Sequence, residues 1–246
     1  MKEVSHRTVP LERALSKLGI ASRTETRTWI LEGRLSVNGS VVQDTSLMVE
    51  PERCNFALDG TPLKIPEFRL ILFHKPKGIV CTQNDPDGKP TIYDILPQEL
   101  HSLQAVGRLD RYTSGLLLLT NNTRCSHFLT DPANKILRTY IAEVRGCWGA
   151  NDSERALAGI LEQGEKLSVN SVEILKSSGR ESRLLLSLCE GKNRELRRIC
   201  KALGHEIQKL KRVAYGEYVL GYLPLGEWKE VKLPSSDKFL KIEFLP

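Results

Sequence analysis

The stretch Ala105–Asn121, AVGRLDRYTSGLLLLTN, decides the fold of this 246-residue chain. Its four consecutive leucines, Leu116–Leu119, predict a buried strand. Asp110 lies between Gly107 and Gly115, in a loop that runs directly into this strand. A carboxylate held against an apolar strand is a candidate nucleophile or acid-base group, but an Asp beside glycine also often caps a turn through its side chain. The residues alone leave both interpretations open.

Further strands are predicted on both sides of this stretch. Compact apolar runs at Arg69–His74, Leu116–Thr120, Tyr140–Val144 and Leu184–Leu188 are separated by irregular segments and occasional helices. A parallel sheet would require strict alternation of strands and helices. The larger part of the chain is therefore expected to be an α+β domain with a mainly antiparallel sheet.

The first sixty residues form a small module of their own. Apolar residues recur at helical spacing over residues 11–18, and Gly19 is typical of the residue that follows a helix. Ser22-Arg23-Thr24-Glu25 is a capping box that starts a second helix, and Asn38-Gly39 predicts a tight hairpin turn. Residues 60–69, which contain two prolines, are the expected linker.

Composition excludes several classes of protein. No apolar run approaches the roughly 20 residues of a membrane span, and the mean hydropathy is −0.28. The N-terminus carries no secretory signal pattern, so we expect a cytoplasmic protein that does not bind membranes. No Cys-x-x-Cys or His-x-x-x-His pair occurs, so neither a metal site nor a disulfide framework is expected.

The positive charge is concentrated in one segment. Glu190–Arg212 holds eight basic and three acidic residues, in a chain with 36 Lys and Arg against 30 Asp and Glu. Such a basic face is typical of a protein that binds the phosphate backbone of a nucleic acid. A merely solvated helix face has the same composition, so the charge by itself does not decide between them.

Two family resemblances narrow these alternatives. Residues 11–42, LERALSKLGIASRTETRTWILEGRLSVNGSVV, resemble the S4 RNA-binding domain. The resemblance implies an S4 domain over residues 9–60, with Arg23, Arg27 and Arg34 on structured RNA. Arg23 and Arg27 are four residues apart and share one helix face.

The rest of the chain resembles the RsuA/RluB family of bacterial ribosomal-RNA pseudouridine synthases. The central motif is Gly107–Asp110 followed by Thr113–Leu117. Four further motifs follow the order of the family: His74–Gly78, Arg138–Tyr140, Glu190–Arg198 and Leu223–Trp228. One departure is Asn121-Asn122-Thr123, where the family commonly has Asn-Asp-Gly, so that turn must be built differently.

The resemblance assigns roles to individual residues. Asp110 would be the catalytic carboxylate, acting either on C1′ of the ribose or on a sugar proton. Tyr140 would stack on the extruded uracil, although a core tyrosine on a strand is the simpler alternative. Arg197 would pair with Asp110 or bind phosphate. The other residues expected to contact the base or the RNA are Leu196, Arg108, Lys75, Arg194, Arg198 and Lys201.

These observations define the expected architecture and function. We expect an α+β chain with an S4 domain at 9–60 and a catalytic domain with an RNA-binding cleft at 68–246. The expected activity is cofactor-free conversion of a uridine in ribosomal RNA to pseudouridine, by a monomer acting on rRNA or a ribosomal subunit precursor. The segment Lys75–Pro97 favours 23S over 16S rRNA.

Two other functions compete with this one. A catalytically silent RNA-binding assembly factor or chaperone could keep the same fold, but such a protein has no reason to hold Asp110, Tyr140 and Arg197 together. An enzyme acting on tRNA is disfavoured by the S4 domain, although domain content is only associational.

Overall fold

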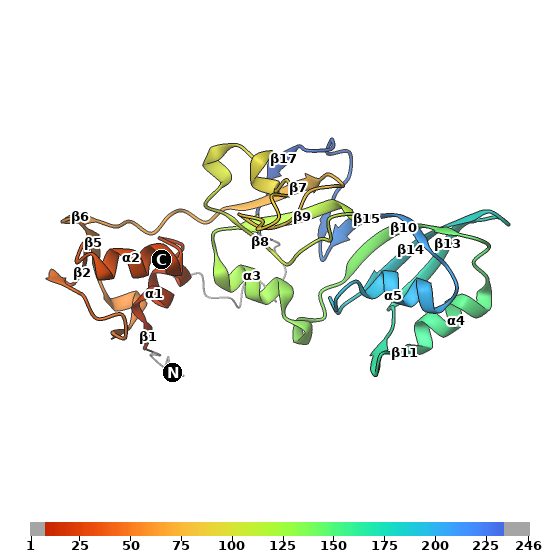
Figure 1. Ribbon diagram of the computed structural model, residues 1–246, viewed down its shortest axis with the longest axis horizontal. Coiled ribbons are helices and arrows are strands. Elements are labelled where there is room, and N and C mark those ends of the chain that lie inside the picture. Colours follow the sequence, from red (N-terminus) through yellow and green to blue (C-terminus); the bar gives the residue numbers. More distant parts are fainter. Residues whose placement is uncertain (1–7, 234–246) are drawn as a thin grey trace. The chain divides into compact units, whose positions relative to one another are not determined.

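The computed structural model of the chain describes residues 8–233 and divides into two compact units. Of the described residues, the first unit contains 8–69 together with Asn121–Cys125, and the second contains Leu70–Thr120 and 126–233. Figure 1 shows the elements of both units coloured along the sequence. Within residues 8–233, no helix combines the length and the apolar character needed to cross a membrane.

The first unit contains two helices and short antiparallel strands. Helices α1 and α2 cover Leu11–Lys17 and Arg23–Leu31, as the sequence predicts. The capping box is confirmed, because the Glu25 amide donates to Ser22 Oγ and the Ser22 amide donates to Glu25 Oε2. The strands are β1 (Val9–Pro10) paired with β4 (Met48–Val49), and a sheet in the order β3 (Ser40–Val41), β2 (Leu35–Val37), β5 (Phe56–Leu58), β6 (Thr61–Pro62), with the 3-10 turn η1 at Pro51–Arg53.

Three details of this unit concern its turns and its connection to the second unit. Asn38 and Gly39 have φ of 51° and 83°, as a type I′ turn requires, so the predicted hairpin is confirmed. Residues 61 and 62 pair with β5, so the connection to the second unit begins later than the predicted residue 60. In the turn that departs from the family pattern, Asn122 Oδ1 accepts from the Cys125 amide at the start of α3.

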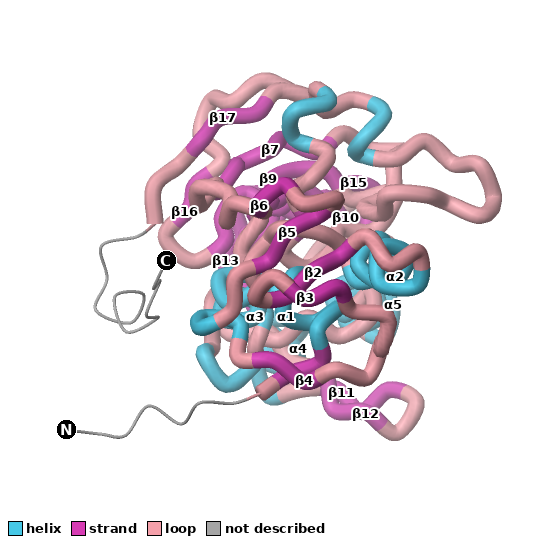
Figure 2. Tube along the Cα trace, turned by 90° about the vertical axis from the view of Figure 1, so that its left-hand side faces the viewer, coloured by secondary structure: helices cyan, strands magenta, loops and turns pink. Residues whose placement is uncertain are grey.

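The second unit is built on a nine-stranded sheet, whose strands are magenta in Figure 2. The main order is β13 (Ser171–Ser177), β14 (Glu181–Leu188), β10 (Arg138–Arg145), β15 (Ile207–Tyr215), β9 (Ser114–Thr120), β7 (Leu70–Lys75), β17 (Trp228–Glu230), with β8 (Gln104–Ala105) on β9 and β16 (Tyr218–Val219) on β15. Among the described pairs of this sheet, β15 with β9 is parallel and the others are antiparallel. The predicted mainly antiparallel α+β fold is therefore confirmed.

The remaining elements are short. The helices are α3 (Thr123–Thr130), α4 (Ala150–Ala158) and α5 (Glu195–Ala202); the 3-10 turns are η2 (Ile92–Asp94), η3 (Gln98–Leu100) and η4 (Pro132–Asn134); and β11 (Ile160–Glu162) pairs with β12 (Glu165–Leu167). Apolar side chains of α5, η2 and η3 join one core cluster with the sheet. This cluster packs against one face of the sheet.

One row of residues crosses this face of the sheet. Lys75 on β7 pairs with Gly115 on β9, Gly115 with Arg212 on β15, Arg212 with Tyr140 on β10, and Tyr140 with Leu186 on β14. Directly paired residues of neighbouring strands point to the same face. Two cations and one aromatic ring therefore lie on the side that faces the core.

A bulge in β15 adds a further ring to this face. The partners of Thr139 and Tyr140 are Ala214 and Arg212, so Val213 is an extra residue in its strand. In a regular strand, residues three apart would point to opposite faces. The extra residue instead places Arg212 and Tyr215 on the same face.

Gly115 allows β9 and β15 to approach closely at the centre of the sheet. Its φ is 110°, and a Cβ there would lie 2.6 Å from the Arg212 nitrogen and still closer to the Arg212 carbonyl oxygen. No side chain fits in that space, because the obstructing atoms belong to the backbone. This contact joins the strands β13, β14, β10 and β15 to the strands β9, β7 and β17 in one sheet.

We expect Gly115→Ala to lower the free energy of unfolding by more than about 2 kcal/mol, because it combines a positive φ with a backbone clash. Denaturant unfolding followed by circular dichroism measures the effect. Gly179→Ala is the matched control, since a Cβ at Gly179 meets nothing within 4 Å. Equal unfolding midpoints for Gly115→Ala and wild type would contradict this account of the sheet.

Candidate active site

A cavity of about 560 Å³ is lined by Tyr140 and Arg212 of the row described above. This volume falls within the roughly 300–1,000 Å³ that is usual for small-ligand sites. Six of the residues predicted from the sequence line it: Arg108, Asp110, Tyr140, Arg194, Leu196 and Arg197. All the lining residues belong to the second unit.

Asp110 stands between two arginines. Its Oδ2 lies 3.8 Å from Arg194 Nη1 and 3.9 Å from Arg197 Nε. About a third of the Asp110 side chain is exposed, so the carboxylate is accessible from the cavity. The predicted ion pair with Arg197 is present, and Arg194 forms a second one that the sequence did not single out.

Two backbone carbonyl groups fix the Arg197 side chain. Its Nη2 donates to the Tyr112 carbonyl at 3.1 Å and its Nη1 donates to the Ile207 carbonyl at 3.3 Å. Its Nε is buried without a hydrogen-bond partner and is the atom nearest Asp110. Burial and the charge of Arg194 lower the pKa of Arg197, while Asp110 opposes them. The guanidinium is therefore held by its two outer nitrogens and presents the third to the carboxylate.

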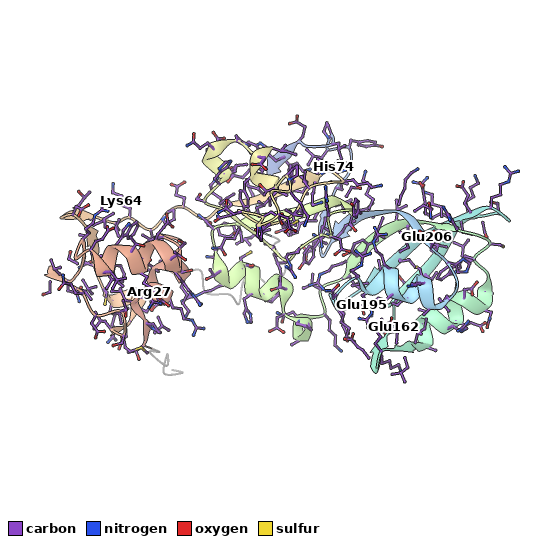
Figure 3. The ribbon with its side chains drawn as sticks, in the orientation of Figure 1. Arg27, Lys64, His74, Glu162, Glu195 and Glu206 are labelled. Atoms are coloured by element: carbon purple, nitrogen blue, oxygen red, sulfur yellow. The ribbon has the colours of Figure 1, made fainter. Side chains whose placement is uncertain are left out.

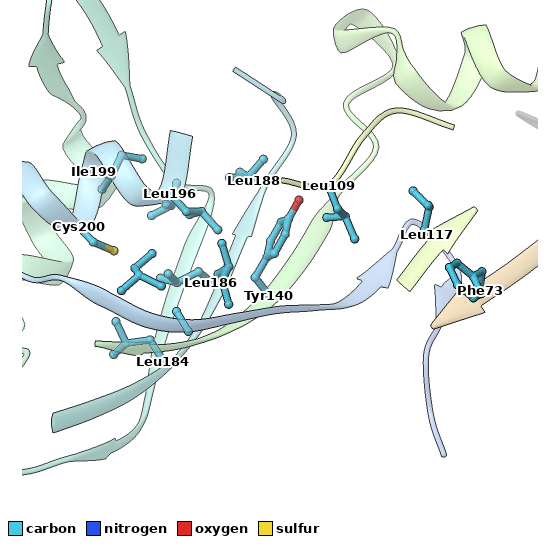
Figure 4. Close-up of a cluster of buried hydrophobic side chains, with 14 of the residues drawn as sticks. Phe73, Leu109, Leu117, Tyr140, Leu184, Leu186, Leu188, Leu196, Ile199 and Cys200 are labelled. Atoms are coloured by element: carbon cyan, nitrogen blue, oxygen red, sulfur yellow. The ribbon is translucent and has the colours of Figure 1, made fainter. Parts of the chain in front are cut away.

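Tyr140 belongs to both the core and the cavity wall. The residue is 9% exposed. Its ring lies in the same cluster as Leu109 and Leu186, as Figure 4 shows. Leu196 of α5 is 4% exposed and also joins this cluster. The alternative of a core tyrosine is thus correct for the position of Tyr140, yet the residue also lines the cavity.

Lys75 does not bind RNA as predicted, because its side chain is fully buried. Its Nζ donates to the carbonyls of Pro76 at 3.0 Å, Thr113 at 3.0 Å and Asp110 at 3.4 Å. Burial lowers the pKa of Lys75, while Cys81 and Asp110 raise it. Two of its three hydrogen bonds thus hold the ends of the Asp110–Thr113 turn. Lys75 therefore positions the carboxylate through the backbone of its loop.

Arg198 has protein partners that the sequence did not reveal. Its Nε donates to Glu162 Oε2 at 2.6 Å and its Nη1 donates to Glu165 Oε2 at 2.7 Å. Figure 3 shows Glu162 beside α5. Arg198 thus ties α5 to the β11–β12 hairpin and does not line the cavity. Its predicted contact with RNA stays a prediction.

The remaining predicted RNA contacts lie on exposed surface. Arg108 at the cavity and Lys201 on α5 are exposed, as are Arg23 and Arg27 on α2. Arg34 is also exposed but donates to Asp59, which lowers the pKa of that carboxyl. Their contacts with RNA stay predictions.

Sequence reasoning missed Arg212, which lines the cavity while only 2% exposed. It entered the sequence analysis only as part of a basic segment. The bulge at Val213, which turns Arg212 and Tyr215 to one face, has no signal in the sequence pattern. Within residues 8–233, no group of three or more His, Cys, Asp or Glu side chains is arranged to hold a metal ion.

Comparisons with known proteins agree with this fold. Residues 69–202 match the RNA pseudouridylate synthase family, and residues 9–53 match the S4 domain. The chain is 32% identical over 243 residues to an "Uncharacterized RNA pseudouridine synthase" of Aquifex aeolicus (strain VF5), covering 97% of each chain. It is 33% identical over 234 residues to "Ribosomal large subunit pseudouridine synthase B" of Yersinia pestis, covering 92% of this chain and 74% of that protein. It also resembles a crystal structure of a pseudouridylate synthase with a TM-score of 0.66 and 28% identity, over 91% of this chain and 96% of the other.

The fold and the family match define the class of protein as an RNA-modifying enzyme, and its cavity holds a loop carboxylate near two arginines with a buried tyrosine in the wall. With these matches, the chain belongs to the RNA pseudouridylate synthase family, preceded by an S4 domain.

We expect Arg197→Lys to lower kcat by about 100-fold and to change RNA affinity by less than about threefold. A lysine keeps the charge but cannot hold both carbonyls and also reach Asp110. Single-turnover rates at saturating RNA, with binding measured separately, check this. Arg198→Lys, one residue along α5 and paired elsewhere, should keep its rate. An increase in KM with an unchanged kcat would instead show that Arg197 binds phosphate.

Proposed function

We propose that the chain converts a uridine of ribosomal RNA, in 23S rRNA, to pseudouridine, with Asp110 as the catalytic carboxylate. One observation carries this proposal: Asp110 lies within 4 Å of two arginines in a cavity whose wall includes Tyr140. The choice of RNA is supported by the relatives named for the large ribosomal subunit and by the S4 match.

The reaction begins with extrusion of the target nucleotide from the RNA. Enzymes that act on a base flip it out of the stack, at a cost of a few kcal/mol. Arg108, which is exposed at the cavity, would contact the phosphate of the opened strand. Tyr140 and Leu196 supply apolar surface for the uracil, and stacking on an aromatic side chain contributes about 1–3 kcal/mol.

The chemical step exchanges one glycosidic bond for another. The N1–C1′ bond breaks, the uracil turns, and C5 bonds to C1′ before C5 loses its proton. Asp110 either attacks C1′ or removes a sugar proton, and both routes need the carboxylate aimed at the ribose. Arg194 and Arg197 orient that carboxylate, and Lys75 holds its loop.

The protein would act as a cytoplasmic monomer on rRNA or a ribosomal subunit precursor. The carboxylate, the two arginines and the tyrosine on which this proposal rests all belong to the second unit. Arg23 and Arg27, exposed four residues apart on α2, would add contacts to the RNA backbone.

Pseudouridine mapping of rRNA from cells with and without the gene tests this proposal. We expect one position in 23S rRNA to lose its pseudouridine when the gene is absent. A gene with Asp110→Asn should fail to restore it although the variant still binds rRNA, because the amide keeps the shape and loses the nucleophile or base.

Asp87→Asn is the matched control, since this carboxylate is exposed and pairs with Lys89, and it should restore the modification. Unchanged rRNA in the deletion strain would reject ribosomal RNA as the substrate. Restoration by Asp110→Asn would show that the modification does not need this carboxylate, as expected if the protein is an RNA-binding assembly factor.

A further inference from the structure

Arg212 is a buried cation without a matching anion. It is 2% exposed, and among the described residues no carboxylate pairs with it. Its Nε donates to the Leu116 carbonyl at 2.7 Å, and its guanidinium lies 4.9 Å from the centre of the Tyr215 ring. Its Nη2 is buried and has no hydrogen-bond partner. A buried charge and an unsatisfied donor both cost free energy, so their presence in a cavity wall points to a ligand.

The position of Arg212 relates it to the base rather than to the ribose. It pairs across the strands with Tyr140, the ring expected to face the uracil, and it lines the same cavity. Arg194 and Arg197 are the cations within 4 Å of Asp110. The charge of Arg212 is therefore available to another group in the cavity.

The proposed reaction supplies such a group. When the N1–C1′ bond breaks, its electron pair leaves with the uracil, which becomes an anion with charge on N1, O2 and O4. The C5 electron pair then forms the bond to C1′, and the C5 proton is released. In the same step C1′ separates from the Asp110 oxygen, or the proton held by Asp110 returns to the sugar. Between the two bonds the detached base carries a full negative charge.

The geometry points to Arg212 as the group that holds the detached uracil, with Nη2 donating to an oxygen of the anionic base. This inference rests on the proposed function. A preorganised buried donor of this kind stabilises charge that develops in the reaction without having to reorganise. It also retains the free base while the base turns.

Arg138 is a second arginine in the cavity wall, and its hydrogen bonds are those of a structural residue. Its guanidinium also lies 4.9 Å from the Tyr215 ring centre and it also lines the cavity. Its Nη1 donates to the carbonyls of Cys189 and Glu190, and its Nη2 donates to Tyr215 Oη and the Leu129 carbonyl. Both outer nitrogens of Arg138 are occupied, whereas Nη2 of Arg212 is free.

The test compares Arg212→Met with Arg138→Met and Arg212→Lys. The substrate is an unmodified 23S rRNA transcript, with single-turnover rates, RNA affinity and Tm measured for each protein. We expect Arg212→Met to keep its RNA affinity within about threefold and to lose about 100-fold in rate. Replacing a buried charge by an apolar side chain of similar size is often neutral for stability, so its Tm should stay near that of wild type. Arg138→Met should instead lower the Tm more and the rate per folded molecule less, and Arg212→Lys should recover part of the rate.

A second substrate keeps the test decisive if Arg212→Met folds poorly. The same transcript is made with 5-fluorouridine, whose base is the more stable anion, and loss of the target nucleoside is followed by digestion and mass spectrometry. If Arg212 stabilises the anion, the rate deficit of Arg212→Lys is smaller on the fluorinated RNA. Equal deficits on both RNAs, or a rate that only follows the folded fraction, would assign Arg212 a structural role. Pseudouridine formation by wild type in the same assay tests the proposed function separately.

Discussion

The close parallel contact between β9 and β15 at Gly115 is the constraint on which the rest of the catalytic unit depends. On one side of it, β9 continues from the loop that carries Asp110, and on the other β15 pairs with the strand that carries Tyr140. A Cβ at Gly115 would collide with the backbone of Arg212. The carboxylate and the tyrosine come from segments thirty residues apart, and this contact brings them to one face of one sheet.

The site concentrates positive charge around a single loop. Lys75 binds the backbone of that loop, and Arg194 and Arg197 flank the Asp110 carboxylate. Arg212 completes the set without a carboxylate of its own. Burying such charges costs stability that an apolar core would not lose, and proteins tolerate this cost mainly at functional sites. By contrast, Arg198 is paired with two carboxylates and serves the fold.

The sequence predicted the parts of this structure that local chemistry determines. The leucines of Leu116–Leu119, the capping box at Ser22 and the turn at Asn38 need only their neighbours, and each is confirmed. The roles of Lys75 and Arg212 depend instead on strand order, register and a bulge, which bring distant residues together. The sequence pattern of a basic residue in a strand does not reveal whether its side chain contacts RNA, binds backbone carbonyls as Lys75 does, or lines a cavity as Arg212 does.

The central claim is that Asp110 acts on a nucleotide whose base lies against Tyr140. A crystal structure of the Asp110→Asn variant bound to an rRNA fragment that contains the target uridine tests this most directly. The account predicts an extruded uridine with its uracil on the Tyr140 ring and its ribose within about 3–3.5 Å of the side chain at position 110. A target uridine that stays stacked in the RNA, or a base bound outside this cavity, would contradict it.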